Sequence, residues 1–134
     1  MIQKDIELIL LRQWASHLAM PIFLTGADGE LLFYNEPAEA LIGVRFDEAG
    51  EMPAARIARI FKTKNEDGTP MKAGELPLTV ALNERRPSHR VVRFEGLDGV
   101  GRTVEVTAVP VTAQGGRNLG AVVFFWEAKR EAGS

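Results

Sequence analysis

The last third of the chain contains three long runs that are rich in valine, threonine and aromatic residues, which favour β-strands. These runs cover residues 88–96, 102–111 and 118–127, and glycine-containing turns separate them. The middle run alternates, with Val104 on one side of the strand and Glu105 on the other. Because consecutive strands joined by short turns pair locally, these runs predict an antiparallel meander.

The first third of the chain predicts a helix followed by a short hairpin. Apolar residues recur at helical spacing through residues 3–19, and Pro21 ends that segment because proline supplies no backbone amide. Two short apolar runs follow at residues 21–26 and 31–35, and the Asp-Gly pair between them favours a tight turn. These runs predict two further strands.

Short helices are expected between the two groups of strands. Residues 36–42 predict one helix, and residues 75–85 predict another, with Leu78 and Leu82 on one face. The pattern from residue 44 to residue 74 is weak and predicts one irregular helix and a turn. The order of elements predicts an α+β fold, with one five-stranded antiparallel sheet, short helices on one face and an additional N-terminal helix.

Length and charge narrow the classes of function. The 134 residues suffice for one domain, and the net charge of −2 gives no basic field for nucleic acid or an anionic membrane. Charged residues interrupt the N-terminal segment, where a signal peptide would carry an unbroken apolar run. No run approaches the roughly 20 apolar residues of a membrane-spanning helix. We therefore expect a soluble, cytoplasmic domain that binds neither nucleic acid nor membrane.

The residues that carry chemistry in enzymes are scarce or badly placed. The chain has no cysteine, which excludes thiolate catalysis and cysteine-bound metals. Ser88 and His89 are neighbours on a predicted strand and point to opposite faces, so they cannot form a nucleophile–base pair. Asp28, Asp67 and Asp98 each precede a glycine, where turn formation explains them. The sequence predicts no catalytic residue, no metal site and no enzyme.

Three segments together point to a known family. They read ADGELLFYNEPAEALIG, ELPLTVALNERRP and LDGVGRTVEVTAVPV, and the last leads through Gly120 into the final strand. In this order and at these separations, the segments resemble the hairpin and helix, the Leu-Pro helix and the late hairpin of the PAS family of sensor domains. No single segment is specific to that family, but their combination is.

The resemblance divides the chain into three parts. It covers residues 21–127, while residues 1–20 resemble the extra N-terminal amphipathic helix of many PAS domains, which serves in dimerisation or as a cap. Residues 128–134 form a C-terminal tail. PAS domains commonly end in an Asp-Ile-Thr-like segment that leads to an effector, whereas this chain has a different sequence after Trp126. The chain is then either a fragment of a larger signalling protein or a module that associates with separate chains.

The resemblance implies a ligand pocket between the inner face of the sheet and the short helices. Strand alternation and the family pattern place ten apolar side chains there, which suit a small hydrophobic ligand held by burial. Alternatively, these side chains simply fill the core. Asn35, which ends a strand and begins a helix, is expected to cap that helix rather than contact a ligand. The expected pocket residues are Phe23, Leu78, Leu82, Val92, Phe94, Val104, Val106, Ala108, Val123 and Phe125.

The sequence leaves the cofactor of this pocket unknown but limits the choice. Relatives that use flavin in blue-light photochemistry react through a cysteine, and this chain has none. Haem-binding relatives use a histidine on the helix before the third strand, and residues 75–85 contain no histidine. His17 and His89 lie elsewhere, so the sequence does not favour haem.

Apolar side chains are also expected on the outer face of the last strand. An apolar sheet face must be covered, and the wide apolar arc of the N-terminal helix can cover it within one chain or between two. Since PAS dimers commonly use this helix and this face, we predict a homodimer. Its expected interface residues are Ile6, Ile9, Leu11, Trp14, Val122, Phe124 and Trp126.

The resemblance implies a function in signal transduction. We expect a sensor domain of a bacterial histidine kinase, in a two-component system, or of another regulatory protein. It would bind a small hydrophobic ligand, mediate dimerisation, or do both. The alternative is a ligand-free module for protein–protein association.

Overall fold

The computed structural model describes residues 3–60 and 62–128 of the chain. In the first half the elements are α1 (Gln3–Ser16), β1 (Ile22–Thr25), β2 (Leu31–Tyr34), α2 (Glu36–Ile42), α3 (Phe46–Ala49), α4 (Ala54–Ile60) and β3 (Lys62–Asn65). The second half contains η1 (Ala73–Glu75), α5 (Pro77–Glu84), β4 (Ser88–Glu95), β5 (Gly101–Thr112), η2 (Gln114–Gly116) and β6 (Asn118–Glu127).

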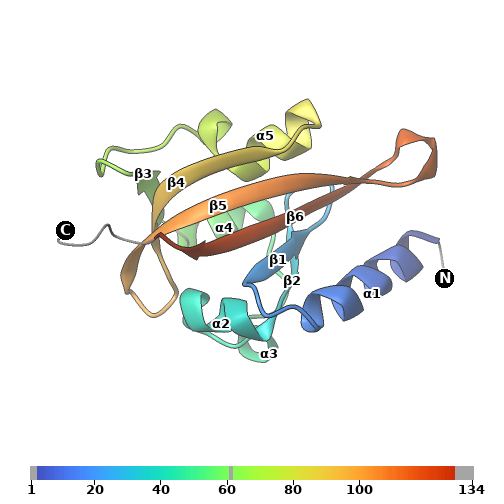
Figure 1. Ribbon diagram of the computed structural model, residues 1–134, viewed down its shortest axis with the longest axis horizontal. Helices are drawn as coiled ribbons and strands as arrows, with labels where there is room; N and C mark the ends of the chain where they lie inside the picture. Colours follow the sequence, from blue (N-terminus) through green and yellow to red (C-terminus); the bar gives the residue numbers. More distant parts are fainter. Residues whose placement is uncertain (1–2, 61, 129–134) are drawn as a thin grey trace.

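The strands form one antiparallel sheet in the order β2-β1-β6-β5-β4-β3 (Figure 1). The predicted meander is confirmed, because β4 pairs with β5 and β5 pairs with β6. The last strand, β6, also pairs with β1, so the first and last strands of the chain lie side by side in the sheet. The α+β class is confirmed, with α1 preceding the sheet as expected.

The expected number of five strands was wrong, because β3 adds a sixth strand at one edge of the sheet. Its sequence is Lys-Thr-Lys-Asn, with exposed lysines alternating with two partly buried residues. A polar edge strand of this kind carries no apolar signal, although lysine is a common means of protecting a sheet edge. Across the pairing with β4, Lys62 lies opposite Glu95 but Lys64 lies opposite Arg93, so charge gives no consistent signal for this pairing.

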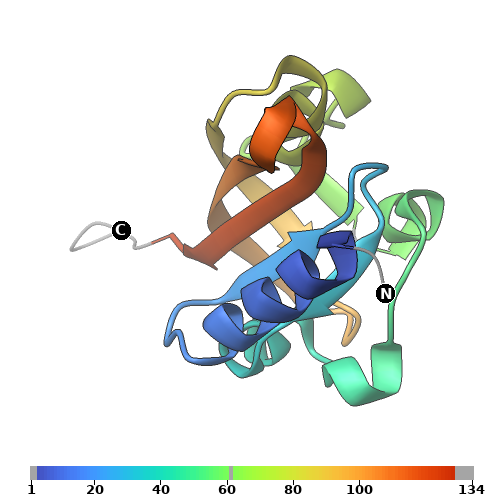
Figure 2. The same cartoon turned by 90° about the vertical axis from the view of Figure 1, so that its right-hand side faces the viewer.

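Helices cover the two faces of the sheet unequally. On the inner face, α5 packs along β4, β5 and β6, and Ala81 contacts a core of small residues there. On the outer face, α1 lies across β1 and β2 and leaves much of β4, β5 and β6 uncovered (Figure 2). Ala15 of α1 is fully buried against Ile22 and Leu24 of β1. The N-terminal helix is therefore a partial lid on its own sheet.

Asn35 ties the end of α1 to the start of α2. Its Oδ1 accepts hydrogen bonds from the backbone amides of Ile22 and Ala38, both at 3.1 Å, and the second of these confirms the expected helix cap. Its Nδ2 donates to the carbonyl oxygens of Ala15 at 3.0 Å and Met20 at 2.9 Å. Asn35 is only 1% exposed. Its side chain therefore supplies the hydrogen bonds that water would otherwise make to the backbone groups of three elements.

Tyr34 closes the inner core beside α2 and α3. Its ring packs against Phe46 with the two planes at 81°, and its hydroxyl donates to the carbonyl oxygen of Val44 at 2.7 Å. Burial, with smaller contributions from Glu39 and Glu48, raises the pKa of Tyr34 to about 12. The hydroxyl therefore stays protonated and keeps its hydrogen bond well above neutral pH.

Candidate functional site

An apolar cavity of about 130 Å³ lies between the inner face of the sheet and the helices. Of the described residues that line it, Thr63 alone carries a polar side chain. The lining residues are Phe23, Leu31, Ile42, Ile57, Thr63, Leu76, Pro77, Leu78, Val92, Phe94, Val104, Val106, Val123 and Phe125.

The sheet wall of the cavity follows from strand pairing. Val92 lies opposite Val104 across β4 and β5, and Val106 lies opposite Phe125 across β5 and β6. Side chains that are directly opposite share a face of the sheet, so these pairs place four apolar groups on the inner side. The ring of Phe125 lies 5.6 Å from that of Phe23 and 6.4 Å from that of Phe94, measured between centroids. Aromatic rings thus form one side of the wall.

The opposite wall comes from the start of α5 and the residue before it. This segment contributes Leu76, Pro77 and Leu78, and Pro77 is the first residue of α5, a position that needs no amide donor. An ion pair attaches it to the sheet: Arg90 Nη1 lies 3.1 Å from Glu75 Oε2 and 3.4 Å from the carbonyl oxygen of Glu75. Because both side chains are about one-third exposed, solvent weakens this attraction, and the ion pair positions the wall more than it stabilises the fold.

The outer face of the sheet, beside α1, carries partly exposed apolar groups. Trp14 is 46% exposed, and its ring meets that of Phe124 edge-on at 6.4 Å. Leu10, one turn before Trp14 on α1, is 58% exposed. These groups form a ridge at the border between α1 and the uncovered part of the sheet.

A polar cluster interrupts the apolar outer face. Glu105 accepts a hydrogen bond from the indole Nε1 of Trp126 at 3.0 Å, and its other oxygen lies 3.2 Å from His89 Nε2. His89 Nδ1 lies 2.6 Å from the hydroxyl of Thr107, its cross-strand partner. The four residues orient one another across β4, β5 and β6.

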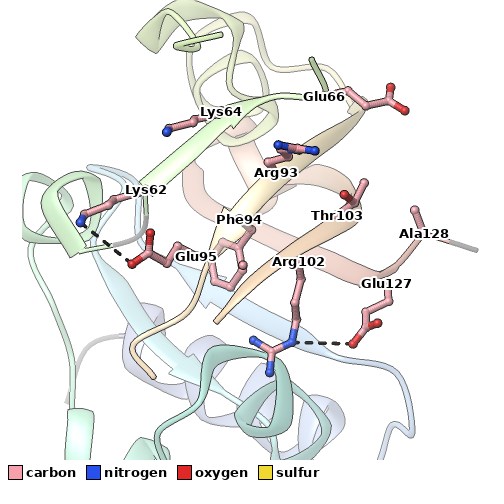
Figure 3. Close-up of a pocket in the computed structure, with 11 residues that line it drawn as sticks. Lys62, Lys64, Glu66, Arg93, Phe94, Glu95, Arg102, Thr103, Glu127 and Ala128 are labelled. Atoms are coloured by element: carbon pink, nitrogen blue, oxygen red, sulfur yellow. Dashed lines mark ion pairs between the residues drawn. The ribbon is translucent and has the colours of Figure 1, made fainter. Parts of the chain in front are cut away.

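A larger, open hollow of about 760 Å³ lies around β3, β4 and β5 (Figure 3). Its lining carries both signs of charge, and the charges are partly paired. Lys62 lies 4.0 Å from Glu95, and Arg102 lies 3.7 Å from Glu127. Close to this hollow, the backbone amide of Val100, and to a smaller extent Arg102, lower the pKa of Asp98. A lining with mixed, exposed charges does not select one class of ligand.

The described part of the chain carries neither a metal-binding cluster nor a membrane-spanning helix. Among those residues, no group of three histidine, aspartate or glutamate side chains is arranged to hold a metal ion. No helix within the same part is both long and apolar enough to cross a bilayer.

Comparison with known proteins rests on structure, because no family model and no curated protein matches the sequence. The PAS domain of BvgS from Bordetella pertussis is 18% identical, with a TM-score of 0.60 over 94% of this chain and 89% of that one. The PAS domain of nitrogen regulation protein NR(II) from Vibrio parahaemolyticus is 17% identical, with a TM-score of 0.63 over 89% and 98%. The PAS domain of the fruit-fly ELK potassium channel reaches a TM-score of 0.66 at 8% identity, over 92% and 98%.

The chain has the PAS fold. This confirms the fold that the three sequence segments indicated. The domain boundaries at residues 20 and 127 stay predictions, although α1 and β6 end close to them.

Within the PAS fold, the predicted pocket residues divide into two groups. Eight of the ten line the cavity, whereas Ala108 and Leu82 do not. Ala108 is fully buried in a neighbouring cluster with Ala81 of α5, and Leu82 packs against that cluster. At this cluster α5 packs directly against the sheet, and neither residue lines the cavity. That a ligand occupies the cavity stays a prediction.

The predicted interface residues also fall into two groups, which differ in burial. Val122 is buried and Leu11 partly buried in the core beneath α1 of their own chain. Ile9 and Trp14 are both 46% exposed, and Phe124 and Trp126 are partly buried. The side chain of Ile6 lies outside the described part of the structure. That these residues form a dimer interface stays a prediction.

Sequence reasoning missed part of the cavity wall and the hydrogen bonds that join Glu105, His89 and Thr107 to Trp126. Leu76 and Pro77 directly precede a predicted pocket residue, so the helix start could have indicated them. Leu31, Ile42 and Ile57 come from segments far apart in the chain, and no local pattern indicates that they meet.

Proposed function

We propose that this chain is the sensor module of a signalling protein and that it binds a small apolar molecule in the cavity. The observation that carries the proposal is the cavity itself, because a core closely packed with its own side chains would leave no such space. The named neighbours include domains of BvgS and of a nitrogen regulation protein, which supports a regulatory role. The sensor would be a non-catalytic part of a bacterial histidine kinase or other cytoplasmic regulator.

Strand β6 offers a physical route from the cavity to the outer face. Val123 and Phe125 line the cavity, whereas Val122 and Phe124 belong to the cluster beneath α1. A ligand that moves the inner side chains of β6 also moves the outer ones, because the same backbone carries both sets. A signal arises where the ligand prefers one of two arrangements of α1 on the sheet.

The test is a ligand screen on the purified chain. Each compound is added in a thermal unfolding assay, and native mass spectrometry then measures the bound mass. A ligand present at 100 times its dissociation constant is expected to stabilise the fold by about 2.7 kcal/mol. The screen includes hydrocarbons, fatty acids, flavin and haem. If no compound of any class binds, the sensing proposal fails.

A second function, ligand-free association, is favoured by the ridge of Leu10 and Trp14. These exposed apolar groups adjoin the uncovered sheet face, and indole rings are frequent at the centre of protein interfaces. We propose that two copies of the chain pair here, with α1 of each copy contributing to the interface.

Changing Trp14 to Glu is expected to weaken this dimer roughly 30-fold, because a buried interface tryptophan commonly contributes about 2 kcal/mol or more. Analytical ultracentrifugation measures the dissociation constant, and circular dichroism checks that the fold is intact. Gln13→Glu, at an exposed position on the same helix, provides the control and should leave the dimer unchanged. A Trp14→Glu chain that dimerises as strongly as the control would place the interface elsewhere.

A further inference from the structure

The volume of the cavity limits the size of its ligand. At about 130 Å³ it is close to an engineered cavity of about 150 Å³ that binds benzene or xenon. Sites for drug-sized molecules measure roughly 300–1,000 Å³. A flavin or a haem therefore exceeds this cavity several times over, although the PAS fold alone does not exclude either group.

The chemistry of the wall limits the polarity of the ligand. Among the described lining residues only Thr63 has a polar side chain, and the backbone groups of β4, β5 and β6 are engaged in strand pairing. A hydroxyl or carboxylate on the ligand would lose its hydrogen bonds to water and find few replacements. The expected penalty for one hydroxyl is a tenfold or larger loss of affinity.

The shape of the wall favours a flat ring. Phe23, Phe94 and Phe125 lie with ring centroids 5.6 Å and 6.4 Å apart along one side, and their planes are tilted against one another. Tilted rings at this distance present both edges and faces, which an additional aromatic ring contacts favourably. Branched aliphatic side chains such as Val92 and Val104 form the neighbouring surface.

We propose that the cavity selects an apolar molecule of the size of one six-membered ring, such as benzene or toluene, and rejects fused rings and hydroxylated analogues. This inference rests on the proposed sensing function of the same cavity.

The first test is a titration of the unmodified chain, followed by nuclear magnetic resonance of the backbone amides. Toluene is expected to shift amides of β4, β5 and β6 that border the cavity. Phenol should bind at least tenfold more weakly, and naphthalene should cause no shift at the same concentration. Naphthalene, flavin or a fatty acid binding more tightly than toluene would overturn the size selection but leave the sensing function intact. Absence of binding by every compound would overturn both.

The second test uses two neighbouring valines with opposite orientations. Val92 lines the cavity and is 2% exposed, whereas Val91 lies on the outer face opposite Glu105. Val92→Phe is expected to fill much of the cavity and reduce toluene affinity at least tenfold, while Val91→Phe should leave it unchanged. Equal toluene affinity in the two variants would place the ligand outside the cavity and overturn the inference. If Val92→Phe does not fold, the titration of the unmodified chain decides alone.

Discussion

Replacing Asn35 with Asp is expected to lower the free energy of unfolding by about 3–5 kcal/mol at pH 7, although the two side chains have nearly the same shape. The Nδ2 group of Asn35 donates to the carbonyl oxygens of Ala15 and Met20 at 3.0 and 2.9 Å. An ionised carboxylate cannot donate, and it would place a negative charge against these oxygens at a site that is 1% exposed. Urea-induced unfolding, followed by circular dichroism, measures the loss.

The pH dependence of this loss of stability shows whether the charge of the new side chain or its shape causes the loss. Carbonyl oxygens around the new carboxyl would raise its pKa in the folded state above the value in the unfolded state. A raised folded-state pKa penalises folding at pH values above the unfolded-state pKa, with the full penalty reached above the folded-state pKa, and the penalty disappears once both states are protonated. The stability difference between Asn35→Asp and the unmodified chain should therefore shrink as the pH falls from 7 toward 4.

A matched change at Asn118 provides the control. The Oδ1 of Asn118 accepts from the backbone amide of Gly120 at 3.1 Å, and an aspartate can accept the same hydrogen bond. Asn118→Asp should therefore change stability by less than about 0.5 kcal/mol. If Asn35→Asp were no worse than Asn118→Asp, the amide of Asn35 would not be holding α1 to the domain.

Some contacts of Asn35 can be predicted from the sequence and others cannot. A polar residue between a strand and a helix predicts the cap on Ala38, three residues away, because capping is a local interaction. The bonds to Ala15 and Met20 join residues 20 and 15 positions apart. No local pattern contains them, because they depend on where α1 ends relative to the sheet.

The same division applies to the candidate site. Alternation along the strands predicts which side chains face inward, and it does so for Val104, Val106 and Ala108 alike. It does not predict how far along the strand the helices approach, which is why Ala108 falls under α5 and Val104 borders the cavity. Strand β3 was not predicted for a different reason. Its lysines make it polar, so no apolar pattern in the sequence indicates that it pairs with β4.

The absence of a side chain at Gly120 allows β1 and β6 to lie close together. Gly120→Ala is therefore expected to destabilise the fold by about 3 kcal/mol or more. Its φ of +133° is a conformation that residues with a side chain rarely adopt. An added Cβ would overlap the carbonyl oxygen of Thr25 and lie 2.8 Å from the carbonyl carbon of Gly26. Since both obstacles are backbone atoms, relief requires β1 and β6 to separate.

For a chain of this length, a loss of 3 kcal/mol corresponds to a fall of about 10 °C in Tm, which differential scanning calorimetry measures directly. Gly101→Ala is the matched control, because no atom lies within 4 Å of a Cβ added at Gly101 and its φ is not positive. That control should stay within about 0.5 kcal/mol of the unmodified chain. Equal Tm values for the two variants would mean that β1 and β6 are not packed this closely. Because β6 also borders the cavity, Gly120→Ala should weaken toluene binding as well, whereas Gly101→Ala should not.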